Sequence, residues 1–311
     1  MAPAEGSRWG DLQRPPLRHT PLRRALVAPA GQFAALDLLD ACPSTNTELA
    51  ARAAAGGVAD LSVLTTDDQT AGRGRLDRTW TTPPRSALAT SVLLRPGPDV
   101  PVLKWSWLPL LAGVAIVEAL RAVAGLPAVL KWPNDVLVPD GPDAASAPPG
   151  KVCGVLSQVV WTPEGEAVVL GFGLNVSQTR AELAVPAATS LLLAGSATTD
   201  RDTLLRACLR ALAGWYLRWT AAAGDAVRCG LAAAARDVCC SIGQRVRVEL
   251  PAGAEPLSGV AEGLDDDGRL LVRVDPDVAA AHSARTVPVA AGDVVHLRPS
   301  EPAREPLEDD R

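Results

Sequence analysis

The hydrophobic pattern of this 311-residue chain changes after residue 236, and the change limits the folds that it can adopt. Before that point, apolar stretches of strand length and of helix length follow one another. After it, short segments begin with the strictly alternating run Arg245–Leu250 and are separated by Gly- and Asp-containing turns. Alternation with a period of two predicts half-buried strands. We therefore expect an α+β domain over residues 36–236 and a small β-barrel over 237–299, with a flexible lead-in (1–35) and an acidic tail (300–311).

Helices and strands are mixed in the expected larger domain. The Ala-rich run Thr45–Ala55 begins with capping-box spacing between Thr45 and Glu48 and stops at Gly56, which predicts a helix. Further helices are expected at 105–124, 201–223 and 225–236. Strands are expected at 61–66, 86–94, 128–138 (interrupted at Pro133), 152–161, 167–176, 245–250, 257–264, 269–274 and 293–297.

The segment Asp68–Trp80 stands out for its chemistry. It follows an expected strand and contains two glycines, which allow close backbone approach to a ligand. Its three arginines, Arg73, Arg75 and Arg78, carry planar, permanently charged groups that suit phosphate, and Trp80 offers a flat face to a nucleobase. Successive backbone N–H groups in such a loop can also hold an anion. A Gly/Arg loop on its own is more often a solvated turn, so the neighbouring motifs decide whether this loop is interpreted as a phosphate site.

Composition narrows the function classes. The net charge of −5 and the sequence pI of about 5.3 argue against bulk nucleic-acid binding, which favours a basic domain. Among the 30 basic residues only Lys104, Lys131 and Lys151 are lysines. In a chain that uses arginine almost everywhere, each lysine is a candidate for a contact that needs a compact ammonium. Lys104 precedes an apolar helix and has the least distinctive setting.

The cysteines and the apolar stretches indicate a reduced, cytoplasmic protein. None of the 6 cysteines has C-x-x-C spacing, and the 3 histidines lie far from most of them, so no protein zinc site is expected. The N-terminus lacks a secretory apolar region. The apolar run Trp105–Val117 is shorter than the roughly 20 residues of a membrane span.

Four further short motifs share the chain with the arginine-rich loop. Ser44-Thr45-Asn46 places polar side chains at a helix start, where capping alone could explain them. The second motif, Lys131-Trp132-Pro133-Asn134-Asp135, is the least common of the four. The third is Lys151-Val152-Cys153-Gly154-Val155-Leu156, and the fourth is Gly171-Phe172-Gly173-Leu174-Asn175-Val176. The glycines of the fourth motif lie in an expected strand, which they weaken unless something must approach its backbone closely.

Taken in order, these motifs resemble those of the biotin protein ligases, also called holocarboxylase synthetases. The resemblance covers roughly residues 36–299. It implies a mixed, mostly antiparallel sheet backed by helices and followed by an SH3-like barrel. It also implies an ATP- and Mg²⁺-dependent reaction in which biotin becomes biotinyl-5′-AMP and is then transferred to a lysine of a biotin carboxyl-carrier protein domain, for example that of acetyl-CoA carboxylase.

The residue roles that follow are implied by this resemblance. Lys151, Arg73, Asp135 and Lys131 would act at the reaction centre, with Lys151 holding first the biotin carboxylate and then the adenylate phosphate. Asp135 would orient either the metal or the acceptor amine. Biotin would contact Ser44, Thr45, Asn46, Gln69, Arg73, Gly74, Arg75, Lys151, Gly154 and Gly171. ATP or the adenylate would contact Arg75, Arg78, Trp80, Lys131, Asn134 and Asn175, with Gly173 allowing close approach.

Several positions depart from the family pattern or have simpler explanations. Leu76-Asp77 replaces a commoner Arg-Gly, and Gln158 stands where an acidic residue is common. The insert 139–150 is longer than a tight connection needs. Trp132 and Pro133 fit packing roles, Arg78 could be a surface arginine, and Asp135 could simply pair with Lys131. Residues 1–35 show no helix-turn-helix pattern, so we expect no DNA binding.

Two rival functions stay open from the residues. A lipoate or octanoate protein ligase would share the catalytic fold, and a non-catalytic biotin sensor would keep the pocket without turnover. The arginine loop, the KWPND string and the β-rich end together favour the biotin ligase. No membrane partner is expected, and both a monomer and a homodimer are compatible with the sequence.

Overall fold

The larger domain of the computed structural model is built on a seven-stranded sheet. The structure describes residues 14–75, 78–141, 148–250, 255–274, 285–290 and 292–296. The strand order is β1-β2-β5-β9-β8-β7-β6, and only β1 and β2 run parallel. The predicted mixed, mostly antiparallel sheet is therefore confirmed. Its strands are Ala35–Cys42 (β1), Ser62–Gln69 (β2), Ala87–Leu94 (β5), Val129–Lys131 (β6), Asp135–Val138 (β7), Gly150–Thr162 (β8) and Gly165–Asn175 (β9).

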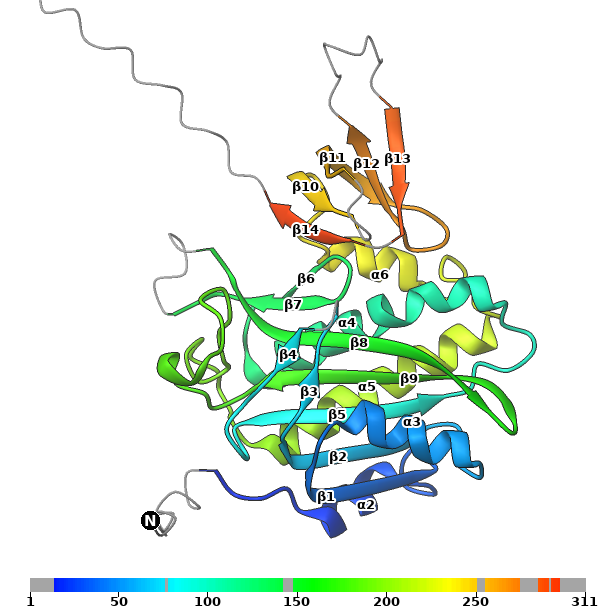
Figure 1. The fold of residues 1–311 in the computed structure, drawn as a ribbon, viewed down its shortest axis with the longest axis vertical. Coiled ribbons are helices and arrows are strands. Elements are labelled where there is room, and N and C mark those ends of the chain that lie inside the picture. The colour runs from blue at the N-terminus through cyan, green and yellow to red at the C-terminus, as the bar shows by residue number, and fades with distance from the viewer. Residues whose placement is uncertain are drawn as a thin grey trace, which may run out of the picture.

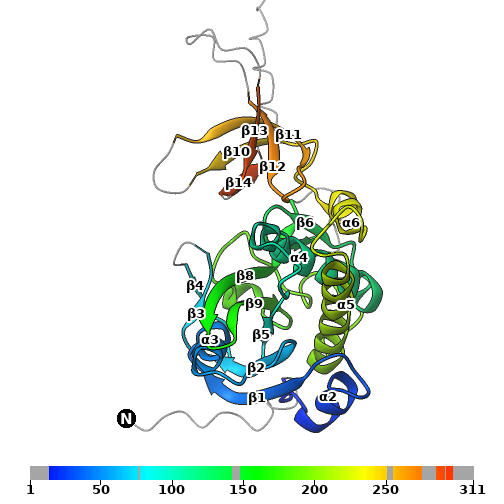
Figure 2. The same cartoon turned by 90° about the vertical axis from the view of Figure 1, so that its right-hand side faces the viewer.

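Helices cover both faces of this sheet. α4 (Leu108–Ala119) and α5 (Arg201–Ala221) lie on one face, and α3 (Thr45–Ala55) lies on the other (Figures 1 and 2). Side chains alternate accordingly along β5, because Leu88 and Val92 join the core with α4 and α5, whereas Leu93 packs with Leu49 of α3. Ser91 and Gly171 of the central strands thus lie on the α3 side of the sheet, where both are next to Asn46 of α3.

The apolar stretch before β6 forms the predicted long helix. It begins as a 3₁₀ turn (Val102–Trp107), continues as α4 and ends as a π-helical turn (Leu120–Ala124) at Gly125, whose φ is 68°. Val102–Ala124 is long and apolar enough to span a membrane by length and composition alone, but 72% of its most apolar window is buried inside the protein. That burial is typical of a core helix.

The N-cap of α3 lies one residue before the predicted one. Ser44, not Thr45, is the N-cap, and its Oγ accepts a hydrogen bond from Thr47 N at 3.4 Å. The Thr45–Glu48 capping box was therefore a wrong prediction. Glu48 instead pairs with Arg52 one turn later, at 2.8 Å. Because Ser44 caps the helix, the Thr45 hydroxyl is free to face the sheet, where it bonds to Gln69.

The lead-in prediction is wrong for residues 14–35. This segment contains α2 (His19–Leu26), whose Leu22 and Leu26 are buried in the main core, and it continues into β1. The basic residues between these leucines hid the apolar face of the helix from sequence inspection. Strand β1 was also missed, because its burial pattern does not alternate regularly. Residues 1–13 lie outside the described residues.

The C-terminal residues form a five-stranded antiparallel sheet in the order β13-β12-β11-β10-β14, which confirms the expected all-β domain. It lies at one end of the main sheet, after α6 (Figure 1). Trp132 joins the two domains, donating through its backbone N to Ser241 Oγ at 3.2 Å and through Nε1 to the Gly268 carbonyl at 3.1 Å. The elements are α6 (Leu231–Val238), β10 (Arg245–Glu249), β11 (Leu257–Leu264), β12 (Leu270–Val274), β13 (Arg285–Val289) and β14 (Asp293–His296). Sequence reading missed β13, and the predicted acidic tail lies outside the described residues.

Candidate active site

A cavity of about 490 Å³ opens on the α3 side of the main sheet. Its size is in the usual range for small-molecule sites. Every site residue predicted from the sequence lines it, although these residues come from motifs spread along the chain. They are Ser44, Thr45, Asn46, Gln69, Arg73, Gly74, Arg75, Arg78, Trp80, Lys131, Asn134, Asp135, Lys151, Gly154, Gly171, Gly173 and Asn175.

Buried hydroxyl and amide groups form one end of the cavity, called here the polar end (Thr45, Asn46 and Gln69), and Ser91 of β5 supports it from behind the lining. Gln69 Oε1 accepts hydrogen bonds from Thr45 N at 2.9 Å and from Thr45 Oγ1 at 3.2 Å. Ser91 Oγ lies 2.6 Å from Asn46 Oδ1 and 2.7 Å from Thr45 Oγ1. These bonds fix the polar end in advance of ligand binding. Ser91 was missed as a supporting residue, because it is one of several hydroxyl residues in a mostly apolar strand and nothing local distinguishes it.

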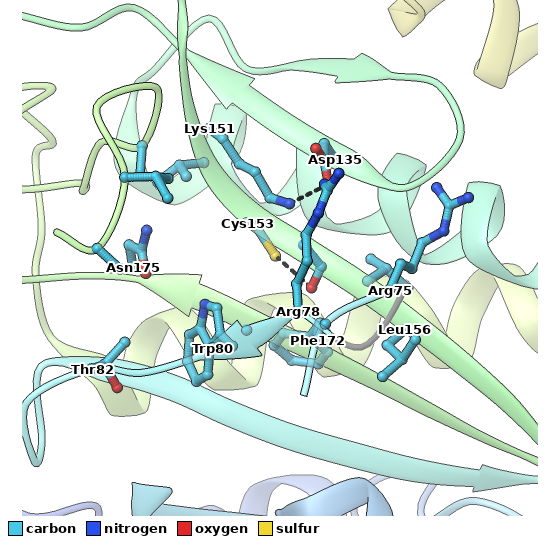
Figure 3. A pocket seen from close by; sticks show the side chains of 18 of the residues that line it. Arg75, Arg78, Trp80, Thr82, Asp135, Lys151, Cys153, Leu156, Phe172 and Asn175 are labelled. Carbon is cyan, nitrogen blue, oxygen red and sulfur yellow. Dashed lines mark hydrogen bonds and ion pairs between the residues drawn. The ribbon is translucent and has the colours of Figure 1, made fainter. Parts of the chain in front are cut away.

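An ion pair lies among the residues that line the cavity. Lys151 Nζ lies 2.6 Å from Asp135 Oδ1, and the two residues come from the adjacent strands β8 and β7 (Figure 3). Gly154 pairs with Asp135 in the register, and a Cβ on Gly154 would lie 3.2 Å from Lys151 Nζ. The glycine therefore leaves room for the lysine chain. Both charged side chains remain partly exposed to the cavity, at 40% for Lys151 and 24% for Asp135.

The arginine-rich loop is a two-stranded ribbon, called here the arginine ribbon. β3 (Gly72–Arg73) pairs with β4 (Thr79–Trp80), and Gly74 N donates to Arg78 O at 2.6 Å. Arg75 Nη1 donates to Asn134 Oδ1 at 2.8 Å, which joins the ribbon to the KWPND motif. The departures at Leu76 and Asp77 lie outside the described residues.

The C-terminal domain contributes a residue to the cavity that sequence reading missed. Asp293 of β14 lines the cavity and forms an ion pair with Arg78 of the arginine ribbon. Gly292 O accepts a hydrogen bond from Arg75 Nη2 at 3.3 Å. No local motif marks Asp293, because its partners lie more than 200 residues earlier in the chain.

The glycines of β9 admit protein side chains. A Cβ on Gly171 would lie 2.0 Å from Asn46 Oδ1, and a Cβ on Gly173 would lie 2.7 Å from the Trp80 ring. The predicted close approach is thus present, but the approaching groups are Asn46 and Trp80. Trp80 consequently lies against the strand at Gly173, and its ring is on the same side of the view in Figure 3 as Asn175 and Thr82.

Residues 179–189, called here the cavity wall, close the end near Asn175. Asn175 Nδ2 donates to Thr189 O at 3.0 Å, and Asn175 Oδ1 accepts from Gln178 Nε2 at 3.1 Å. Asn175 therefore uses one end of its amide on the wall and the other on Gln178, just before the wall, which reduces what it can offer a nucleotide. The wall residues that line the cavity are Glu182, Leu183, Ala184, Val185, Ala187 and Ala188.

The charge of the cavity lining is mainly positive. Five of the lining residues are basic and three are acidic: Asp135, Glu182 and Asp293. Burial raises the pKa of the Cys153 thiol well above its ordinary value, so this lining residue stays protonated and is no nucleophile. Among the described residues, no three His, Cys, Asp or Glu side chains cluster as metal ligands.

Comparison with known proteins identifies the family. Residues 38–175 match the biotin/lipoate A/B protein ligase family, and residues 241–297 match the biotin protein ligase C-terminal domain. The chain is 41% identical over 291 residues to the biotin–[acetyl-CoA-carboxylase] ligase of Mycobacterium tuberculosis, covering 93% of this chain and 98% of that protein. The chain belongs to the biotin protein ligase family.

Other members of the biotin protein ligase family extend the comparison. The bifunctional ligase/repressor BirA of Bacillus subtilis is 29% identical, with 80% of this chain and 71% of that protein covered. The biotin protein ligase of Aquifex aeolicus, solved in complex with biotin and ATP, superposes with a TM-score of 0.66 at 24% identity, covering 85% of this chain and all of that one. This second likeness confirms the fold.

Proposed function

We propose that this biotin protein ligase activates biotin with ATP and transfers it to a lysine of a biotin carboxyl-carrier protein domain. The observation that carries the proposal is the Lys151–Asp135 ion pair, which lines the same cavity as the preformed polar end and the arginine ribbon. The M. tuberculosis relative acts on acetyl-CoA carboxylase, so the carrier domain of that enzyme is the expected acceptor.

The polar end suits the ureido group of biotin. Gln69 Oε1 is already used by Thr45, which leaves the Gln69 amide N–H groups to face the cavity. A cyclic urea presents a carbonyl oxygen and two N–H groups, so it needs both donors and acceptors from the site. The buried hydroxyls of Ser44 and Thr45 and the Gln69 amide provide both kinds.

Adenylate formation joins two anions, so the site must lower their repulsion. In this step a biotin carboxylate oxygen attacks the α-phosphorus of ATP, and the bond to the pyrophosphate oxygen breaks. Lys151 would leave Asp135 to hold the carboxylate and then the developing negative charge on the phosphate. Arg73, Arg75 and Lys131 line the same cavity and add positive charge. Holding the two reactants in line can lower the barrier by roughly 7–11 kcal/mol.

Transfer then uses the acyl group of the adenylate. The neutral ε-amine of the acceptor lysine attacks the acyl carbon, an amide bond forms, AMP leaves, and the amine loses a proton. Asp135, freed from Lys151 by the bound anion, lies where it could accept a hydrogen bond from the incoming amine or hold a metal ion. These two roles predict different defects when its charge is removed.

The lining residues fit Mg²⁺ bound with ATP. Mg²⁺ is usually held by one or two carboxylates together with substrate phosphates. Asp135 provides such a carboxylate, and its Oδ1 has an ion pair with Lys151 but no hydrogen bond among the described residues. When bound, the ion would neutralise phosphate charge.

We expect the ligase to be cytoplasmic and to have no DNA-binding activity. All six cysteines are free thiols, as in a reducing compartment. Before β1, residues 14–34 contain the single described helix α2, whose apolar side is already packed in the core. Sequence-specific retardation of a biotin-operon promoter by the purified protein would contradict the second expectation. Sedimentation would decide between a monomer and a homodimer.

The proposed function is tested by direct detection of the adenylate. The purified protein is mixed with ATP, Mg²⁺ and biotin, lipoate or octanoate, and the products are identified by mass. Biotinyl-AMP alone, followed by mass gain of a carrier domain, is the expected result. Lipoyl- or octanoyl-AMP would assign the chain to the rival ligases, and bound biotin without pyrophosphate release would indicate a sensor.

A further inference from the structure

Arg14 ties the N-terminal segment to the cavity wall. Its guanidinium donates two hydrogen bonds to the Glu182 carboxylate, from Nη1 to Oε1 at 3.0 Å and from Nη2 to Oε2 at 2.7 Å. Nη2 also donates to the Ser177 carbonyl at 2.9 Å. Arg14 therefore binds both Ser177 and Glu182, the two ends of the short segment that leads into the wall. Paired bonds of this kind fix orientation as well as distance.

The same carboxylate shapes the wall from within. Glu182 Oε2 accepts from Thr179 N at 2.8 Å and from Thr179 Oγ1 at 3.0 Å, which completes a capping box around the 3₁₀ turn Arg180–Glu182. Arg14, the largest cause, lowers the pKa of Glu182 to about 2. Glu182 is thus ionised at neutral pH and accepts all of these bonds.

The wall in turn borders the reaction centre. Lys151 N donates to Ala187 O at 2.8 Å, and Thr189 N donates to Lys151 O at 2.9 Å, so the wall runs beside the strand that carries Lys151. Trp80, Thr82 and Asn175 lie toward one side of the cavity and Leu156 toward the other (Figure 3). Leu156 O accepts a bond from Asn46 of the polar end. The wall therefore lies beside Lys151, whereas the polar end contacts Leu156, five residues further along the same strand β8.

The residues next to Arg14 are themselves hydrogen-bonded to the core of the protein. The Pro15 carbonyl accepts a bond from Arg201 Nη2 at 2.7 Å, and Leu17 N donates to Asp67 Oδ1 at 3.2 Å. Arg201 is only 6% exposed and is also paired with Asp67 at 2.7 Å. The segment 14–18 is thus attached to the start of α5 and the end of β2, two elements of the rigid core.

We propose that Arg14 is a positioning residue for the nucleotide end of the cavity. Through Glu182 it holds the apolar wall residues Leu183–Ala188 in place beside Lys151 and Asn175, where the adenosine part of ATP would lie. This inference rests on the proposed biotin ligase activity. Because the polar end lies away from the wall and is fixed by its own bonds, the inference predicts a defect in ATP binding without one in biotin binding.

The test separates the two substrates. Pyrophosphate release is measured for Arg14→Ala with ATP varied at saturating biotin, and then with biotin varied at saturating ATP. A partly exposed ion pair with two parallel bonds contributes modestly, so its loss should raise the KM for ATP about 3- to 10-fold. The kcat and the KM for biotin should stay near wild type. Arg14→Lys keeps the positive charge but cannot donate two parallel hydrogen bonds, so its KM for ATP should lie between those of Arg14→Ala and the wild type.

Arg95→Ala is the matched control. Arg95 has a similar set of partners, a carboxylate (Glu164 at 2.9 Å) and a carbonyl (Val58 at 3.2 Å), and a similar side-chain exposure (17%, against 22% for Arg14). Its contacts do not involve the cavity lining. Arg95→Ala should leave the KM for ATP unchanged.

Two further readouts keep the test decisive. Backbone amides of residues 179–189 should exchange hydrogen faster in Arg14→Ala but not in Arg95→Ala. Glu182→Gln should reproduce the ATP defect, and its combination with Arg14→Ala should add little to it. Equal KM values for ATP in Arg14→Ala and wild type, or an equal rise in the KM for biotin, would overturn the proposal. Wild-type turnover is measured separately, so a protein inactive toward biotin and ATP would count against the proposed function and not against Arg14.

Discussion

The carboxylate of Asp293, on the first residue of β14, forms an ion pair with the Arg78 guanidinium of the arginine ribbon. The pair brings the C-terminal domain to the cavity, where Asp293 also lies 4.0 Å from Arg75 Nη1. Arg78 is 67% exposed, so the pair itself adds little to global stability. Its consequence is local, because it holds two of the three ribbon arginines near the site.

Asp293→Asn should therefore separate stability from activity. We expect a change of less than about 1 kcal/mol in the free energy of unfolding. The KM for ATP should rise several-fold, since Arg75 and Arg78 lose the anchor that orients them toward phosphate. Urea unfolding and pyrophosphate release measure the two effects. A large loss of stability with an unchanged KM for ATP would show that Asp293 acts as an ordinary structural residue.

Lys151→Ala should abolish adenylate formation while the protein remains folded. The Lys151 side chain is 40% exposed, so its removal leaves no buried cavity, yet it takes away the cation nearest Asp135. Loss of one such charge at a reaction centre slows chemistry by about 10²- to 10³-fold or more. Lys104→Ala is the control, because Lys104 has a comparable ion pair with Asp267 at 2.8 Å outside the cavity. Near-normal adenylation in Lys151→Ala would remove the central residue of the mechanism.

Asp135→Asn should identify the role of that carboxylate. If Asp135 holds Mg²⁺, adenylate formation falls and excess Mg²⁺ restores part of it. If Asp135 orients the acceptor amine, biotinyl-AMP still forms and only its transfer to the carrier slows. Single-turnover measurement of the two steps distinguishes these outcomes. An unchanged rate in both steps would reduce Asp135 to a structural partner of Lys151.

The sequence predicted the site better than it predicted the edges of the fold. All the predicted site residues meet in one cavity because each lies in a short motif with its own chemical signature. Ser91 and Asp293 were missed for the opposite reason, since each matters only through partners distant in the chain. α2 and β1 were missed because the basic residues of α2 and the irregular burial of β1 obscure the period that marks a helix or a strand. Short sequence motifs therefore predict which residues carry the chemistry, whereas residues that act through partners distant in the chain are identified only from the structure.

Gly171→Ala should weaken biotin binding. The added Cβ would lie 2.0 Å from Asn46 Oδ1, so the Asn46 side chain must move and lose its 2.6 Å contact with Ser91 Oγ. That contact supports the polar end, and we expect the KM for biotin to rise about 10-fold or more. Gly263→Ala, in strand β11, is the control because a Cβ there meets nothing within 4 Å. Equal biotin KM values in the two variants would show that the polar end does not depend on the Gly171 contact.

His296 should make the interface between the two domains sensitive to pH. Its Nε2 lies 3.0 Å from Ser241 Oγ, the same oxygen that accepts from Trp132 N. Burial, and secondarily the charge of Lys131, lowers the pKa of His296 below its ordinary value of 6.5. Because the folded protein favours the neutral ring, this contribution to stability is fully present above pH 6.5 and is lost as the pH falls through the lowered pKa.

His296→Gln should remove this pH dependence, because glutamine is polar but does not titrate in this range. The free energy of unfolding of the wild type, measured in urea between about pH 5 and 8, should rise with pH over the lower part of that range more steeply than that of the variant. The difference arises because the unfolded wild type binds more protons there than the folded protein does. Parallel curves for the two proteins would mean that His296 titrates alike in both states, and that the Trp132–Ser241–His296 contact does not select the neutral ring.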